Sequence, residues 1–367
     1  MNKVLAPLAP GSTIGILGGG QLGRMLALAA ARLGFNVHVF CPDENSPAFK
    51  VAEKSYLFDY DDEEALGRFA QATDIITYEF ENVPAHTAAY LSAKTPLHPN
   101  AGALKIAQDR LAERKFLTSS DIAIAPYGAI FCLEDIEKTL AEISTPAVLK
   151  ASRMGYDGKG QAVIKTPEDM PDAWEKIGCV PAILEAFIPF EREISVIIAR
   201  SQSGDMVAFD PGENKHVNHI LDQTLVPANI TDITHQKALK IARTIAQALD
   251  YVGILAVEMF VCKTPGYEPL YVNEIAPRVH NSGHWTQDAC HTDQFEQHIR
   301  AICGWPLGSA HRHSDAMMKN LIGDDYYQWP HFAALIDHNV HLYGKTKVRE
   351  GRKMGHVNQT KPRNSPP

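Results

Sequence analysis

Hydrophobic positions in the first hundred residues fall into short apolar runs separated by longer amphipathic stretches. The runs Thr13–Leu17, Val37–Phe40 and Asp74–Tyr78 are typical of buried strands. Between the first two, the apolar residues of Gln21–Leu33 recur every three or four positions, and Gly34 follows. This spacing predicts an amphipathic helix that ends at the glycine. Strands and helices in this order predict an open parallel sheet with helices on both faces, the α/β class.

After the loop at 96–99, a single helix is expected to carry Asp109 and Arg110. The alternation ends near Lys115, and the pattern beyond it is mixed α+β. Apolar runs at Pro146–Lys150 and Gln161–Ile164 flank a glycine-rich loop, which predicts a small antiparallel lid. From about Gly304 we expect helix or loop, followed by a hairpin-like tail. With 367 residues, the chain is long enough for two or three domains with a cleft between them. Further strands are expected at 182–187, 193–198, 254–260 and 270–275, and a helix at 234–249.

Charge and cysteine usage narrow the classes of function. The formal charge of −8 argues against a nucleic-acid partner, because phosphate backbones favour a clustered excess of Lys and Arg. The stretch 345–353 is the one basic exception. The six cysteines form no Cys-x-x-Cys pair, which predicts neither a zinc site nor a disulfide framework. With no secretory leader and no membrane span expected, we predict a cytoplasmic protein without a membrane partner.

A glycine motif near the N-terminus fits the dinucleotide fingerprint. Gly18–Gly23 has the spacing G-x-G-x-x-G between a strand and a helix, and Asp43 lies about where a ribose-binding acid would stand. Backbone N–H groups at a helix N-terminus hold any phosphate, so the motif indicates an anion rather than NAD in particular. A substrate phosphate is favoured, while NAD binding and a merely tight turn remain alternatives.

The loop between the two lid strands combines glycines with cations. Residues 152–161 contain three glycines, and Lys150, Arg153 and Lys159 gather around the same turn. A hairpin turn would explain the glycines but leaves the cations unexplained. Flexible backbone donors with convergent cations favour a cover for a polyphosphate.

Two glutamates stand in apolar strands that a short connection joins. If the strands pair as a hairpin centred near Gly266, Glu258 and Glu274 lie opposite each other on the same face. Like charges in that position repel, so a divalent cation between them, best Mg²⁺, would explain the pair. The alternative is that one glutamate simply faces solvent. The loop that follows carries Arg278, His280, Asn281 and His284, a combination that favours a charge-stabilising cluster.

Four motifs in this order resemble one family. Gly18–Met25, Tyr78–Pro84, Gly155–Gln161 and Asn273–His284 together closely resemble the 5-(carboxyamino)imidazole ribonucleotide synthetases of purine biosynthesis, which are ATP-grasp enzymes. The resemblance implies an ATP-grasp fold with a Rossmann-like N-terminal domain, a mobile lid and a C-terminal body. We expect the N-terminal domain at 1–112, the ATP-grasp domain at 113–302 with its lid at about 113–187, and a C-terminal subdomain at 303–367.

The resemblance also implies a reaction. ATP with Mg²⁺, or possibly Mn²⁺, would phosphorylate bicarbonate to carboxyphosphate. The carboxyl group would then pass to the exocyclic amine of 5-aminoimidazole ribonucleotide, with ADP and phosphate as the other products. A homodimer is expected, and NAD and zinc are not. The alternative within the same fold is a formate-dependent glycinamide ribonucleotide transformylase.

Residue by residue, the resemblance implies three ligand sites and a catalytic set. Glu185 to Ile188 would meet adenine, Glu193 the ribose hydroxyls, and Glu258 and Glu274 the metal. Asp157 would orient the attacking amine or accept its proton. The expected ATP-binding residues are Arg110, Lys150, Gly155, Tyr156, Asp157, Gly158, Lys159, Gly160, Gln161, Glu185, Ala186, Phe187, Ile188, Glu193, His216, Asn273 and Glu274. The expected substrate-binding residues are Gln21, Leu22, Glu79, Tyr156, Asp157, Asn281, Lys345, Arg352 and Lys353. The expected catalytic residues are Asp157, Arg278, His280 and Lys345.

Overall fold

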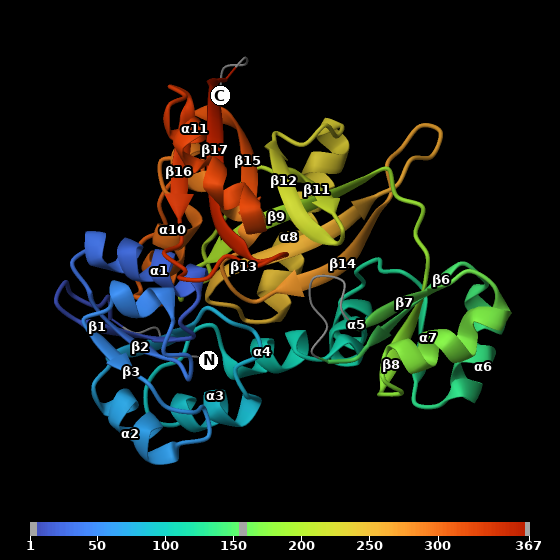
Figure 1. Ribbon diagram of the computed structural model, residues 1–367, viewed down its shortest axis with the longest axis horizontal. Coiled ribbons are helices and arrows are strands. Elements are labelled where there is room, and N and C mark those ends of the chain that lie inside the picture. The colour runs from blue at the N-terminus through green and yellow to red at the C-terminus, as the bar shows by residue number, and fades with distance from the viewer. Residues whose placement is uncertain (1–5, 154–159, 364–367) are drawn as a thin grey trace.

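The N-terminal sheet is parallel, as the hydrophobic pattern predicts. The structure, a computed structural model, describes residues 6–153 and 160–363. The strand order is β3-β2-β1-β4, and Figure 1 shows this sheet at one end of the molecule. Its strands are β1 (Thr13–Leu17), β2 (Asn36–Phe40), β3 (Lys54–Tyr56) and β4 (Ile75–Tyr78), and its helices are α1 (Gln21–Arg32), α2 (Glu63–Gln71) and α3 (Ala85–Ser92).

Alternating side chains divide this sheet between two cores. Ile14 and Ile16 of β1 pack with Leu26 of α1 on one face. Leu17 packs with Phe69 of α2 on the other. The prediction of helices on both faces is therefore confirmed.

The helix expected to carry Asp109 and Arg110 is in fact two helices, α4 (Ala101–Ala107) and α5 (Arg110–Ser119). Asp109 caps the second one, since its Oδ1 accepts hydrogen bonds from the N–H groups of Leu111 (3.0 Å) and Ala112 (3.3 Å). An aspartate that satisfies free N–H groups starts a helix and does not continue one. The single-helix prediction was wrong for this reason.

The predicted antiparallel lid is confirmed as part of a four-stranded sheet, which we call the lid sheet. Its order is β5-β8-β6-β7, and β6 pairs antiparallel with β7, Lys150 opposite Gln161. Two helices pack on it around a separate small core. Figure 1 shows the lid sheet set apart from the rest of the molecule. The elements are β5 (Tyr127–Ile130), α6 (Leu133–Ile143), β6 (Ala147–Ala151), β7 (Gln161–Ile164), α7 (Met170–Lys176) and β8 (Ala182–Ala186).

A nine-stranded sheet forms the body of the molecule. Its main path is β14-β13-β9-β11-β12-β15-β17-β16, with β10 paired to β9. The strands are β9 (Arg192–Arg200), β10 (Met206–Ala208), β11 (Gly212–Val217), β12 (Ile220–Val226), β13 (Gly253–Val261), β14 (Leu270–Ala276), β15 (Ser314–Ile322), β16 (His338–Leu342) and β17 (Lys353–Pro362). The main helices are α8 (Asp232–Ala248), α10 (Gln294–Ile302) and the shorter α9 (Thr286–Ala289) and α11 (Trp329–Ala333).

The segment from about Gly304 was predicted as helix or loop. This prediction was wrong for residues 314–322, which form β15. β15 pairs with both β12 and β17, so it lies inside the sheet. Lys319 and Asn320 break its apolar pattern, but the Lys319 ammonium pairs with Asp222 (2.9 Å) and Asn320 donates to the Leu221 carbonyl (2.8 Å). Polar contacts with β12 therefore permit a strand that the sequence conceals. The tail itself, β16 and β17, forms the expected hairpin.

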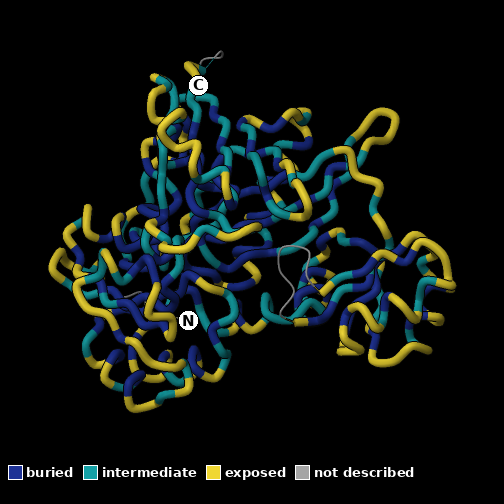
Figure 2. Tube along the Cα trace, viewed as in Figure 1, coloured by how far each residue is buried: buried dark blue, intermediate teal, exposed yellow. Residues whose placement is uncertain are grey.

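Burial follows the sheets, and the exposed segments lie along the outer loops (Figure 2). Among the described residues, no helix is both long and apolar enough to cross a lipid bilayer.

A buried histidine on α10 joins the N-terminal sheet to the body. The Nδ1 atom of His298 accepts from the Ile254 N–H (3.1 Å), and its Nε2 lies 2.8 Å from Thr77 Oγ1. With Nδ1 accepting, the ring is held neutral with its proton on Nε2. Burial lowers the pKa of His298 to about 3.

This pKa shift predicts an acid-sensitive fold. The pKa of His298 in the folded protein lies below its unfolded value of about 6.5. The stabilisation that the neutral imidazole contributes to the fold is therefore complete above pH 6.5 and is lost as the pH falls toward 3. In His298→Asn, the slope of the unfolding free energy against pH should decrease by about 1.4 kcal/mol per pH unit between pH 6 and 4. Urea unfolding across this range measures the slope. His86→Asn, at an exposed position, is the control, and an unchanged slope in His298→Asn would contradict the assignment.

Candidate active site

The two glutamates of the predicted hairpin face each other. β13 and β14 pair antiparallel with Glu258 directly opposite Glu274, which confirms the predicted register. Gly266 in the connection has φ +88°, a conformation that favours glycine. The Glu258 side chain is 13% exposed and that of Glu274 38%. The two glutamates therefore lie on the same face of the sheet, and Glu274 is the more exposed of the two.

The electrostatics of this acid pair suit a divalent cation. Burial, and then the charge of Glu274, raise the pKa of Glu258 to about 8. The nearest basic side chains are Arg110, whose Nη1 lies 3.5 Å from Glu274, and His280, whose Nε2 lies 3.6 Å from Glu258. Burial lowers the pKa of His280 well below its ordinary value, so this ring is neutral and does not offset the acid pair. In the described part of the chain, no three His, Cys, Asp or Glu side chains gather into a metal site. Two carboxylates fit Mg²⁺, which usually takes its other ligands from water and phosphates.

Lys150 lies in a buried ionic network between the lid sheet and α5. Its Nζ lies 2.6 Å from Glu185 Oε2, and Arg114 Nε donates to Glu185 Oε1 at 2.5 Å. Burial opposes the charge of Glu185, but Lys150 and Arg114 outweigh it and lower the pKa of this carboxyl to about 2. The Glu185 carboxylate is thus engaged inside the protein, so any contact of this residue with adenine would use its backbone. Ala186, Phe187 and Ile188 continue from it, and Phe187 is 45% exposed.

Glu193 and His216 lie on the strands beside the acid pair. Glu193 of β9 pairs in register with Phe260 of β13 and with Asn214 of β11. His216 Nδ1 lies 2.9 Å from Glu193 Oε2. Burial disfavours the charged imidazole, yet the Glu193 carboxylate outweighs burial and raises the pKa of His216. The predicted nucleotide residues of β9, β11 and β14 therefore lie in one sheet, in which β13 separates β14 from β9.

The segment after β14 carries the four predicted cluster residues, and two of them, Arg278 and His280, lie near the acid pair. Arg278 donates to the Glu81 carboxylate, which lies beyond β4. His280 Nε2 faces Glu258, while its Nδ1 accepts from the Ser282 N–H at 3.3 Å. Both side-chain polar atoms of Asn281 are buried without a hydrogen-bond partner among the described residues. Buried amides are rarely left unpaired, so Asn281 fits a ligand contact.

His284 does not join this cluster. It is completely buried, with its Nδ1 3.0 Å from Gln294 Nε2 and its ring centroid 4.6 Å from that of His356. Burial lowers its pKa well below the ordinary value. His284 is therefore a neutral core residue, and the prediction that grouped it with the charge-stabilising residues was wrong.

The glycine turn before α1 holds an internal carboxylate. The N–H groups of Gly20 and Gly23 donate to the two oxygens of Glu79, at 2.9 and 3.1 Å. Glu79 thus takes amides that a bound phosphate would need. A phosphate at this turn, which the sequence favours, and the NAD alternative would therefore each lose two of the backbone donors of the motif. Asp43 accepts from the Asn45 N–H, which makes it part of a local turn.

A basic loop between β16 and β17 approaches the same region. Lys345 Nζ donates to the Lys353 carbonyl at 2.7 Å, and Arg352 donates to the Lys347 carbonyl at 2.8 Å. Burial, together with the positive charge of Arg352, lowers the pKa of Lys345 to about 8. The negative charge of Glu79 acts in the opposite direction but does not outweigh them. The loop also meets the N-terminal domain, since Lys50 donates to the Gly344 carbonyl. These cations, Glu79, and the start of α1 with Gln21 and Leu22 are predicted to form the substrate side of the site.

Part of the predicted lid loop lies outside the described residues, namely Gly155, Tyr156, Asp157, Gly158 and Lys159. Its described flanks are held close to α5. The Ser152 carbonyl accepts from the Arg110 N–H at 2.9 Å, and Arg153 pairs with Asp109 at 3.0 Å. At the far flank, the Gly160 carbonyl accepts from the Ala151 N–H beside Gln161.

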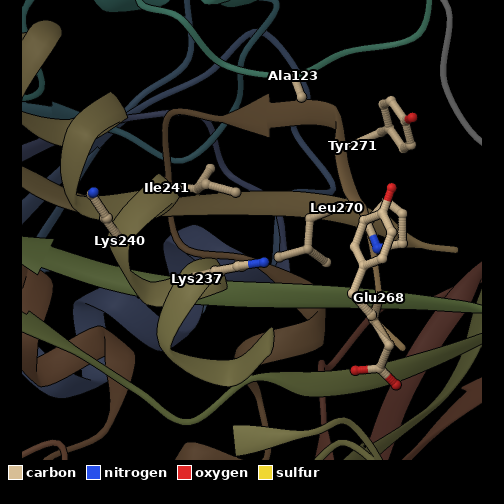
Figure 3. A pocket seen from close by; sticks show the side chains of 9 residues that line it. Ala123, Lys237, Lys240, Ile241, Glu268, Leu270 and Tyr271 are labelled. Carbon is tan, nitrogen blue, oxygen red and sulfur yellow. The ribbon is translucent and has the colours of Figure 1, made fainter. Parts of the chain in front are cut away.

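Two buried residues of this region were missed by sequence reasoning. Glu113 and Arg114 contact both the lid sheet and β14, but no motif or periodicity in α5 marks them as more than an ordinary helical ion pair. A surface pocket formed by α8 and the β13–β14 connection is lined by none of those predicted site residues that the structure describes (Figure 3).

Comparison with known proteins agrees with this geometry. Residues 12–108 match the ribonucleotide synthetase preATP-grasp domain, 115–295 the ATP-grasp domain, and 316–365 the phosphoribosylaminoimidazole carboxylase C-terminal domain. The chain is 49% identical to N5-carboxyaminoimidazole ribonucleotide synthase of Brucella melitensis biotype 1, over 97% of this chain and 98% of that protein.

Solved structures show the same likeness. A crystal structure of an ADP complex of N5-carboxyaminoimidazole ribonucleotide synthetase is 42% identical, with a TM-score of 0.93 over 97% of this chain and 94% of the other. The Aspergillus clavatus N5-carboxyaminoimidazole synthase, in complex with ADP and 5-aminoimidazole ribonucleotide, is 27% identical with a TM-score of 0.88, over 96% and 94%. The predicted ATP-grasp fold is confirmed. The chain belongs to the N5-carboxyaminoimidazole ribonucleotide synthase family of ATP-grasp enzymes.

Proposed function

We propose that this chain catalyses the ATP-dependent carboxylation of 5-aminoimidazole ribonucleotide to N5-carboxyaminoimidazole ribonucleotide in purine biosynthesis. The observation that carries the proposal is the near-full-length likeness to synthases of this name, together with a fold that pairs two acids and has a lid sheet carrying Lys150. The enzyme is accordingly an ADP-forming ligase.

The reaction divides into two steps. A bicarbonate oxygen attacks the γ-phosphorus of ATP, which forms carboxyphosphate and releases ADP. Carboxyphosphate then loses phosphate, and the amine nitrogen of the ribonucleotide bonds to the carboxyl carbon and gives up a proton. The free intermediate hydrolyses readily, so water must be excluded before it forms.

Residues of this chain supply the positioning and the charge. Glu258 and Glu274 would hold Mg²⁺, which, when bound, offsets the charge of the phosphates. Lys150 and Arg278 would add fixed positive charge toward the transferred phosphoryl group. Lys345 and Arg352 would bind the ribonucleotide. Asp157, in the loop between β6 and β7, would orient the amine or accept its proton.

Phosphate release tests the proposal directly. With ATP, Mg²⁺ and bicarbonate, release should require 5-aminoimidazole ribonucleotide and should produce one ADP for each carboxylated product. Release that instead requires formate and glycinamide ribonucleotide would replace the proposal with the transformylase alternative. Quenching of protein fluorescence by NADH would favour the dinucleotide reading of the glycine turn.

The proposal extends to assembly and compartment. A homodimer is expected by resemblance, and light scattering after gel filtration should give about twice the mass of the chain. All six cysteines, which lie in the described residues, are free, and this suits the reducing cytoplasm. A monomer at micromolar concentration would contradict the expected assembly.

A further inference from the structure

Two consecutive charged residues of α5 are almost completely buried. Glu113 is 2% exposed and Arg114 1%. Arg114 Nη1 donates to Glu113 Oε2 at 2.7 Å. Removing such charges from water is costly, and a buried ion pair seldom repays the cost in stability alone. Stability alone therefore does not explain why this ion pair is buried here.

One side of this pair holds the strand that carries Glu274. The Ile275 N–H donates to Glu113 Oε1 at 2.8 Å, and Arg114 Nη2 donates to the Asn273 carbonyl at 2.6 Å. β14 is the last strand of its sheet, with β13 on one side and, on the other, an isolated bridge between Val272 and the segment at Ala123 and Ile124. In a strand, residues 273 and 275 direct their backbone groups to the same edge. Glu113 and Arg114 therefore take the place of a neighbouring strand on both sides of Glu274.

The other side holds the lid sheet. Arg114 Nε donates to Glu185 of β8, and the second oxygen of Glu185 binds Lys150 of β6. One guanidinium thus reaches three acceptors on three segments: Glu113, Glu185 and the Asn273 carbonyl. The planar fork of arginine donates to them from three separate nitrogens. A lysine would have to place all of its donors on one nitrogen, which cannot match this spread. Figure 1 shows α5 between the lid sheet and β14.

We propose that Glu113 and Arg114 form a buried clasp that fixes the lid strands carrying Lys150 and Glu185 relative to the strand carrying Glu274, and that Arg114 is a positioning residue for phosphoryl transfer although it touches no ligand. The clasp rests on the proposed function, because it places the cation and the acid that this function uses. Phosphoryl transfer depends chiefly on positioning and fixed charge, so displacement of Lys150 from Glu274 would slow the reaction itself.

Arg114→Lys tests the clasp with little change in size or charge. We expect kcat for ribonucleotide-dependent phosphate release to fall about 100-fold, as for a misplacement of about 1 Å. The KM for 5-aminoimidazole ribonucleotide should change less than about twofold, because the basic loop of that site is not part of the clasp. ADP affinity, measured by isothermal titration calorimetry, should weaken by about tenfold, or about 1.4 kcal/mol.

Arg312→Lys is the matched control. Arg312 is also buried, at 8% exposure, and also binds two carboxylates, Asp210 and Asp315. Neither carboxylate belongs to a predicted site residue. If Arg114 merely stabilised the fold, both variants would unfold at lower temperature and keep parental kcat and ADP affinity. That result for Arg114→Lys would overturn the proposal.

Glu113→Gln provides a second, independent variant. It keeps the oxygen that accepts from Ile275 but turns an amide toward Arg114, so kcat and ADP affinity should again fall. Because the two residues act together, the double variant should lose little more than either single one. If Arg114→Lys does not fold, Glu113→Gln decides, and parental kcat and ADP affinity in it overturn the clasp. Absence of ribonucleotide-dependent release in the unaltered chain would overturn the proposed function, while ADP titration would still test the clasp.

Discussion

Glu274→Gln is expected to lower kcat for ribonucleotide-dependent phosphate release by about 1,000-fold. The substitution keeps the size of the side chain and its place opposite Glu258, but it removes one of the two charges proposed to hold the metal. An amide is a weaker ligand for Mg²⁺ than a carboxylate, so the charge of the transferred phosphoryl group would lose its main compensation. Steady-state release of phosphate at saturating ATP measures the effect.

Calorimetry separates metal binding from other causes of lost activity. In the parent, Mg²⁺ should strengthen ADP binding, whereas in Glu274→Gln this gain should disappear and metal-free ADP binding should remain. Glu268→Gln is the matched control, because Glu268 lies in the same hairpin and accepts hydrogen bonds from Thr231 instead. An undiminished gain from Mg²⁺ in Glu274→Gln would show that this acid does not hold the metal.

The acid pair was predictable because its cause is local. Strand register fixes which side chains face each other, and a short connection around Gly266 leaves little freedom in register. The parallel N-terminal sheet was predictable for a similar reason, since apolar runs and amphipathic stretches report burial directly. By contrast, β15 was hidden, because Lys319 and Asn320 look exposed in the sequence until the neighbouring strand supplies Asp222 and a carbonyl.

The functions of charged residues that act across the chain were harder to predict. The glycine turn suggested a phosphate site, but Glu79, 59 positions from Gly20, supplies the anion from within the protein. Arg114 joins β8 and β14 through contacts that span 71 and 159 positions. No periodicity encodes such contacts, since they depend on how three segments pack. Sequence motifs therefore point to the residues expected to meet ligands more readily than to the residues that hold those side chains in place.

Lys345→Met is expected to lower kcat/KM for 5-aminoimidazole ribonucleotide by about 100-fold, the loss of one hydrogen bond to a charged group in a buried site. Burial lowers the pKa of Lys345 from its ordinary value to about 8. The free enzyme therefore carries this charge below pH 8 and loses it above. Because kcat/KM reports groups of the free enzyme, it should fall as the pH rises through about 8. The profile is measured between pH 6.5 and 9.5.

The arginine variant isolates the charge from the rest of the site. An arginine stays protonated throughout this range, so in Lys345→Arg the decline above pH 8 should vanish even if the maximum rate is reduced. Lys347→Met is the matched control, because Lys347 is exposed on the same loop and only its carbonyl is used, by Arg352. A decline near pH 8 that persists in Lys345→Arg would assign the titration to another group. It would also argue against a contact between the Lys345 ammonium and the substrate. If that contact exists, its contribution to kcat/KM must disappear when the ammonium loses its proton.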